Sequence, residues 1–345
     1  MSFSTRTTVR FTAGVLAAAL VLSGCAAKVN GDSTSSAAPA AAASAAGGGA
    51  AASGAAAAPA AAGPCAPIKM AMNPWVGYTA NAAVVSYVLE KKLNCKVVQT
   101  DLKAEISWQG FSSGAVDLII ENWGHPDLIK KYIDTDKTAV NAGDTGNIGH
   151  IGWFVNPAAV KLCPGIDTDY KKLNDCADKF ATSESGGKGQ FLDGDPSFQT
   201  IDAHLIENLK LNFKVVYAGS ETALIQAFRD GEKNNKAVIG YFYTPLWFLS
   251  EVPLVNIKLP KYTEGCDADP AKVACDYPDL KLNKIVSKKL ATSGSPAYRV
   301  IQKFTWTNED QNLVAKYITS DKMTNQAAAQ KWVDANPDKV AAWLS

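Results

Sequence analysis

The sequence has few of the side chains that most often carry metal or catalytic chemistry. It contains three histidines, His125, His150 and His204, which are scattered along the chain, and no two cysteines have the CxxC spacing. A zinc site is therefore not expected. No GxSxG motif occurs, SGGKGQ lacks the spacing of a P-loop, and no pair of carboxylates stands out as catalytic. We expect neither an enzyme nor a bound metal or cofactor.

The chain also lacks an excess of either charge. Its 34 basic and 33 acidic residues leave a formal net charge of +1, so no nucleic-acid partner is expected. An apolar run near the start, FTAGVLAAALVL, is too short for a comfortable membrane span. It follows Arg6 and Arg10 and ends in LSGC at Cys25, a secretory signal that resembles the lipobox of bacterial lipoproteins. That resemblance implies a signal at 1–25 and a protein anchored through lipidated Cys25 on the extracytoplasmic face of the cell membrane. The alternative is an ordinary signal peptide with an incidental cysteine.

Residues 26–64 are nearly all Ala, Gly, Ser and Pro. They offer almost no large apolar side chain to bury, so we interpret them as a disordered tether. An Ala-rich helix is the alternative, which the interspersed Gly and Pro oppose.

Cysteine, unlike histidine, is well represented in the sequence. If Cys25 is lipidated, six cysteines remain, an even number that permits three disulfides in an oxidising compartment. Six cysteines allow 15 connectivities. We predict three pairs: Cys163 with Cys176 and Cys266 with Cys275, which close short polar loops, and Cys65 with Cys95, which each lie just before a predicted strand.

The remaining sequence alternates between strand and helix patterns. Strand-like segments at 68–73, 96–102 and 116–123 enclose helical segments at 81–93 and 106–114. This β-α-β-α-β order predicts a parallel sheet with a ligand at the carboxyl ends of its strands.

A second α/β series opens at 179–185. It continues through a loop at 186–197 to a helix at 198–211, a strand at 213–220, a helix at 221–233 and a strand at 236–244. The tail supplies a strand and several helices that are too few to stand alone. We therefore predict that it returns to complete the first lobe, giving lobe 1 at 65–155 and 251–345 and lobe 2 at 156–250.

Aromatic residues gather at the predicted strand ends. Trp75, Trp123 and Tyr243 follow or end strands, and Phe198 lies in the loop before a helix. A trimethylammonium group has no N–H to donate, but the electron-rich faces of several rings can bind it. Each exposed cation–π contact contributes about 0.5 to 1 kcal/mol, rising to about 2 kcal/mol when desolvated, so three or four desolvated rings can support micromolar binding.

Six segments occur in order along the chain: NPWVGYTAN, ENWGHPD, GWFVNP, GDPSF, YFYTPLW and AAAQKWVDANPDKVAAWL. Taken together, they resemble the extracytoplasmic substrate-binding proteins of glycine betaine, proline betaine and choline ABC importers. The resemblance implies a type II periplasmic-binding-protein fold, in which two α/β lobes with two crossover segments enclose a ligand cleft. It also implies a monomer that delivers its ligand to an ABC transporter permease.

The family's binding residues map onto several of these positions. Trp75 and Trp123 match aromatic cage members, and Tyr243 stands where many relatives have Trp. Phe198 lies near a further cage position. Core packing is the alternative for every ring. The other expected ligand-binding residues are Trp153, Tyr78, Ser197, Asp195 and Glu121.

Two features of the sequence bear on whether the ligand carries a carboxylate in addition to its ammonium group. Asp195 followed by Pro196 predicts an N-capped helix start. The N–H groups of Ser197 and Phe198 can hold a carboxylate there. The alternative is a simple capped helix start without a ligand. Glu121 shares a strand face with Trp123 and favours a net cation such as choline, unless it is solvated or hydrogen-bonded.

We therefore predict a lipoprotein that binds a quaternary ammonium osmolyte, either a betaine or choline. A lipid-anchored sensor or adhesion module is the alternative, as is a binding protein for another small cationic or zwitterionic solute.

Overall fold

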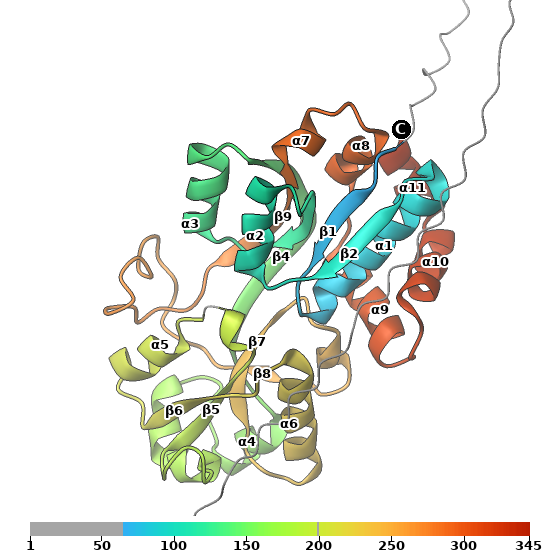
Figure 1. Cartoon of the computed structure of the whole chain (residues 1–345). Coiled ribbons are helices and arrows are strands. Elements are labelled where there is room, and N and C mark those ends of the chain that lie inside the picture. Colours follow the sequence, from blue (N-terminus) through green and yellow to red (C-terminus); the bar gives the residue numbers. More distant parts are fainter. Residues whose placement is uncertain (1–64, 199) are drawn as a thin grey trace, which may run out of the picture. The chain divides into compact units, whose positions relative to one another are not determined.

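The computed structural model describes residues 65–198 and 200–345. The predicted signal, Cys25 and the tether lie outside the described residues. Two α/β lobes are built around one mixed sheet (Figure 1). The strands are β1 (Ile68–Met72), β2 (Val97–Asp101), β3 (Leu118–Asn122), β4 (Ala139–Val155), β5 (Gly189–Asp193), β6 (Phe213–Tyr217), β7 (Ile239–Thr244), β8 (Val255–Asn256) and β9 (Asp279–Ser287).

Helices of very different lengths cover this sheet. The α-helices are α1 (Val76–Leu93), α2 (Ala104–Ser113), α3 (Pro126–Ile129), α4 (Pro157–Leu162), α5 (Asp202–Asn208), α6 (Glu221–Lys233), α7 (Lys288–Ala291), α8 (Pro296–Lys303), α9 (Asn308–Thr319), α10 (Asn325–Ala335) and α11 (Pro337–Leu344). The short 3₁₀ and π segments are η1 (Lys130–Thr135), η2 (Tyr170–Phe180), η3 (Pro196–Phe198) and η4 (Trp247–Ser250).

The strand order is β2-β1-β3-β9-β4-β7-β5-β6, with β8 paired to β4. The pairs β1–β2, β1–β3, β5–β6 and β5–β7 are parallel, as the βαβ pattern predicts. However, β9 runs antiparallel to both β3 and β4. The predicted parallel pairing of the first three strands is therefore confirmed, and the sheet as a whole is mixed because a late strand returns into its middle.

Strand β4 passes through both lobes. Its first part pairs with β9, and its last part pairs with β7. The change occurs at His150, which pairs with Thr244 of β7 and with Asp279 of β9. The two-lobe architecture is thus confirmed, whereas the predicted boundaries at 155 and 250 stay predictions.

Several elements differ from their sequence patterns. The helix expected at 221–233 is α6 as predicted. Helix α1 starts at Val76, five residues before its predicted start, and α5 is shorter than predicted. Strand β5 lies inside the segment 186–197 that was expected to be a loop. The flanking glycines suggest a turn, but pairing with both β6 and β7 makes the short apolar run between them a central strand.

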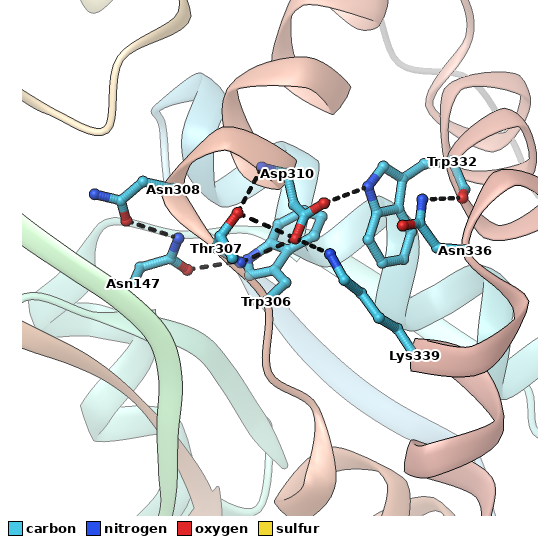
Figure 2. A network of polar contacts seen from close by, with 8 residues as sticks. All are labelled: Asn147, Trp306, Thr307, Asn308, Asp310, Trp332, Asn336 and Lys339. Atoms are coloured by element: carbon cyan, nitrogen blue, oxygen red, sulfur yellow. Dashed lines mark hydrogen bonds and ion pairs between the residues drawn. The ribbon is translucent and has the colours of Figure 1, made fainter.

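The C-terminal helices pack on the first lobe, as predicted from the size of the tail. A polar network connects them to β4 (Figure 2). Trp306 Nε1 donates to Asn147 Oδ1 at 2.9 Å. Asp310 completes a capping box with Thr307 and accepts from Trp332 Nε1 at 3.2 Å and from Lys339 Nζ. One carboxylate therefore joins the start of α9 to both α10 and α11.

The three predicted cysteine pairs are bonded. The Cα–Cα distances are 5.0 Å for Cys65–Cys95, 6.1 Å for Cys163–Cys176 and 6.3 Å for Cys266–Cys275. Within residues 65–198 and 200–345, no helix combines the length and the apolar character needed to cross a membrane.

Candidate functional site

Trp75 and Trp123 stand just after two neighbouring parallel strands of the first lobe, β1 and β3. Trp75 is the extended N-cap residue of α1, and the preceding Asn73 is fixed by hydrogen bonds to Leu102 O at 2.7 Å and Ser107 Oγ at 2.9 Å. Trp123 follows β3, after which Gly124 and His125 have φ of 98° and 61°. These positive φ values turn the chain sharply, which favours Gly at the first position and leaves the indole at the edge of the sheet.

Side chains of the second lobe complete a chain of rings. The centroid distances are 6.2 Å for Trp75–Phe198, 5.8 Å for Phe198–Tyr241, 6.2 Å for Tyr241–Tyr243 and 5.2 Å for Tyr243–Trp123. Trp75 and Trp123 come from the first lobe, and the other three rings come from the second. We call these five side chains the aromatic ring set.

The aromatic ring set borders a cavity of about 450 Å³, the size range of small-molecule sites. Ser197, His125 and Tyr277 also line this cavity. Apart from its tyrosines, the titratable lining consists of His125, Asp127 and Asp267, with no Lys or Arg contributed by the described residues. Burial lowers the pKa of His125, so its imidazole tends to be neutral. The lining is therefore aromatic and acidic.

Glu121 connects the two indoles from behind the cavity. Its Oε1 accepts from Trp75 Nε1 and from Trp123 Nε1, each at 2.7 Å. Its Oε2 accepts from Asn81 Nδ2 and, at 3.1 Å, from Gln311 Nε2. Burial raises the pKa of Glu121 to about 7, although the two indole hydrogen bonds oppose that shift. The carboxylate fixes both rings in place and keeps them turned toward the same space.

Two further buried carboxylates support rings that line the cavity. Tyr243 donates its hydroxyl to Glu221, and Tyr277 donates to Asp202 Oδ1 at 2.9 Å. Burial raises the pKa of both carboxyl groups. Each support leaves the ring face free while it uses the polar edge.

Four predicted ligand residues do not line the cavity. Trp153 is 1% exposed and donates to Asp202 Oδ1 at 2.6 Å, so it belongs to the core of the second lobe. Tyr78 is fully buried, donates to Ala71 O at 2.6 Å and packs edge-on against Trp75 at 5.3 Å. Glu121 lies behind the indoles, and Asp195 lies outside the lining.

Of the two alternatives expected at 195–198, an anion site or a capped helix start, the hydrogen bonds support the capped start, which here begins η3. Ser197 N donates to Asp195 Oδ1 at 2.8 Å, and Phe198 N donates to Asp195 O at 2.9 Å. These amides are therefore already satisfied, and α5 begins only at Asp202. Phe198 and Ser197 do line the cavity, through their place in η3.

Tyr241, His125 and Tyr277 are among the lining residues that sequence reasoning missed. Tyr241 could have been found, because it stands two residues before Tyr243 on β7 and so shares its face. His125 directly follows the Trp123 motif but carries no pattern of its own. Tyr277 comes from a loop before β9, and no local signal places that loop beside the second lobe.

The sequence and the fold were compared with known proteins. The family model for the substrate-binding domain of ABC-type glycine betaine transport systems, OpuAC, matches residues 66–335. The trimethylamine N-oxide-binding protein of Pelagibacter ubique is 28% identical over 291 residues, which cover 78% of this chain and 88% of that protein. The glycine betaine/carnitine transport binding protein GbuC of Listeria monocytogenes is 29% identical over 124 residues, 36% of this chain and 37% of that protein.

Solved structures agree on the fold. A choline-binding protein of an ABC transporter in complex with choline has a TM-score of 0.64 at 17% identity, covering 81% of this chain and 91% of that one. Lactococcal OpuAC, closed with glycine betaine, has a TM-score of 0.62 at 20% identity, covering 81% and 99%. The family match extends over most of the described residues. The chain therefore belongs to the family of substrate-binding domains of ABC-type glycine betaine transport systems.

Proposed function

We propose that this protein captures a small trimethylammonium solute within the aromatic ring set and delivers it to the permease of an ABC importer. The observation that carries this proposal is the joining of five rings from both lobes around one cavity, with the two indoles held on a single carboxylate oxygen. Ring faces attract a cation that cannot be hydrogen-bonded, and desolvation strengthens that attraction.

The charges around the cavity favour a net cation over a zwitterion. Asp127 and Asp267 line it, and Glu121 and Glu221 stand behind its rings. A betaine carboxylate finds no Lys or Arg among the described lining residues, and the Ser197 amide is already bonded. Choline has the same trimethylammonium group without the anion. We therefore infer that choline binds more tightly than glycine betaine.

Anchoring through lipidated Cys25 on the extracytoplasmic face is part of the same proposal. It is supported by the LSGC sequence after an apolar run and by the family, whose members bind substrate for ABC transport systems. Metabolic labelling with a fatty acid analogue tests it, because Cys25→Ser should remove the label.

Isothermal titration of the purified protein tests the ligand class. The ligands are choline, glycine betaine, proline betaine, carnitine and trimethylamine N-oxide. The control is the neutral carbon isostere of choline, in which a tert-butyl group replaces the trimethylammonium group. We expect micromolar binding of choline and much weaker binding of the isostere. Equal affinities would mean that the pocket recognises apolar shape rather than positive charge.

Replacement of a cage ring tests the site itself. Trp123→Ala should weaken choline binding by about 30-fold or more, because a desolvated cation–π contact contributes about 2 kcal/mol. The matched control is Tyr217→Ala, which removes a ring of the second lobe that is 52% exposed and lies outside the cavity. Unchanged binding in Trp123→Ala would exclude the proposed site.

A further inference from the structure

Glu221 joins the two lobes beside the cavity without lining it. It is the first residue of α6 in the second lobe and is 3% exposed. Its Oε2 accepts from the backbone N–H of Val76 at 2.7 Å, and Val76 is the first residue of α1 in the first lobe. Its Oε1 accepts the hydroxyl of Tyr243. One buried carboxylate thus contacts both lobes.

The start of α1 depends on this contact for its polar partner. The first N–H groups of a helix have no intrahelical acceptor. Within the described residues, the side chain of the N-cap Trp75 makes no capping hydrogen bond, and the first turn of α1 has no acidic residue. Glu221 supplies both the acceptor for Val76 N–H and a negative charge at the positive end of an 18-residue helix.

The position of Glu221 connects the cage rings of both lobes. Tyr243 is held directly, and Trp75 immediately precedes Val76. We propose that Glu221 is a positioning residue that holds the lobes together around the ligand, so that it sets how slowly bound solute leaves. This inference rests on the proposed function. Separation of the lobes breaks the Val76 contact and exposes both partners to water.

The ion pair between Lys103 and Asp195 also joins the lobes but is a weaker candidate. Lys103 Nζ lies 3.3 Å from Asp195 Oδ1, but the side chain of Lys103 is 59% exposed. Solvent screening makes such a pair contribute little. The buried contact of Glu221 is therefore expected to dominate the kinetics.

Stopped-flow tryptophan fluorescence with choline tests the proposal. Glu221→Gln keeps the shape of the side chain and removes its charge, and we expect choline to dissociate about tenfold faster with an association rate changed by less than about twofold. Glu221→Asp keeps the charge but shortens the reach to Val76, and it should behave like Glu221→Gln. The matched control is Glu207→Gln, an exposed acid of α5 in the same lobe, which should match the wild type.

Hydrogen–deuterium exchange gives a second readout that needs no ligand. Peptides covering 74–80 contain the Val76 amide. Their exchange in the ligand-free protein should be faster in Glu221→Gln than in the wild type, and choline should slow it in the wild type more than in the variant.

Each outcome separates this inference from the proposed function. If the wild type binds choline but both Glu221 variants show wild-type dissociation rates, the positioning role is wrong. The proposal is also overturned if the association rate falls by the same factor as the dissociation rate rises, because the residue then only shapes the site. If no trimethylammonium solute binds the wild type, the proposed function fails. The ligand-free exchange then decides whether Glu221 holds the lobes together.

Discussion

The carboxyl group of Glu121 should make cation binding depend on pH. Its oxygen contacts both indole N–H groups, and its pKa is raised to about 7, mainly by burial. Below that pH the group is largely neutral. Above it, the carboxylate places a negative charge behind the two rings that face the ligand.

The magnitude follows from the geometry of an indole. A cation against the ring face lies about 7 Å from the carboxylate, and at an effective dielectric constant of about 20 the attraction is about 2 kcal/mol. This corresponds to about 30-fold in affinity. Because the bound cation favours the ionised form, affinity should rise as pH increases toward about 7 and level off above it.

Glu121→Gln is a suitable neutral mimic. The buried oxygens Asn81 Oδ1 and Gln311 Oε1 have no hydrogen-bond partner within the described residues. Both amides can therefore rotate to accept from the new Gln N–H₂ group, while the Gln oxygen still accepts from the two indoles. The variant loses the charge and keeps the contacts of residue 121, at the expense of the 3.1 Å hydrogen bond from Asn81 Nδ2 to Gly77 O.

Titration calorimetry at about pH 5 and about pH 8 measures the effect, because the charge of Glu121 differs most between these conditions. Glu121→Gln should bind choline about 30-fold more weakly than the wild type at the higher pH and about equally at the lower one. Glu207→Gln again serves as the control. A wild-type affinity that does not vary with pH, together with an equal loss in Glu121→Gln at both values, would refute the reasoning.

The same group has the opposite effect on the ligand-free protein. Its folded pKa of about 7 lies above its ordinary value of 4.5, so the folded state holds the extra proton between these values. The contribution of Glu121 to the free energy of unfolding is therefore present at low pH and falls as pH rises from about 4.5 to about 7. Thermal unfolding of the wild type should show this decline, and Glu121→Gln should show less of it.

Two other substitutions separate affinity from stability. In Gly149→Ala the new Cβ would lie 2.7 Å from Cζ3 of Trp123 and 2.9 Å from Cδ2 of Leu282, so the indole must shift. Choline affinity measured by calorimetry should therefore fall by about tenfold. An affinity equal to that of the wild type would show that the ring position is not critical. Asp310→Ala removes the capping box and the hydrogen bond of Trp332. Chemical denaturation should therefore show a free energy of unfolding lower by about 2 kcal/mol, with choline affinity nearly unchanged. A large loss of affinity with normal stability would contradict that separation.

Local patterns predicted the parts of the site that depend on local chemistry. Trp75 and Trp123 could be placed because each follows an apolar strand and precedes Gly or a helix start. The pairs Cys163–Cys176 and Cys266–Cys275 were predicted because they close short loops.

Contacts between distant segments could not be predicted in this way. Strand β9 lies between β3 and β4, although more than a hundred residues separate it from either. Glu121 was expected near the ligand because it shares a strand face with Trp123. Whether its carboxylate contacts the ligand or the indole N–H groups depends on how the side chain of Trp75 is oriented, and Trp75 belongs to another element.

The continuity of β4 limits how the molecule opens. One unbroken strand is hydrogen-bonded to β9 at one end and to β7 at the other. Opening must therefore flex a paired ribbon near His150 instead of swinging on a free loop. A flexing ribbon resists large excursions, so the two halves of the pocket stay roughly aligned while solute is absent.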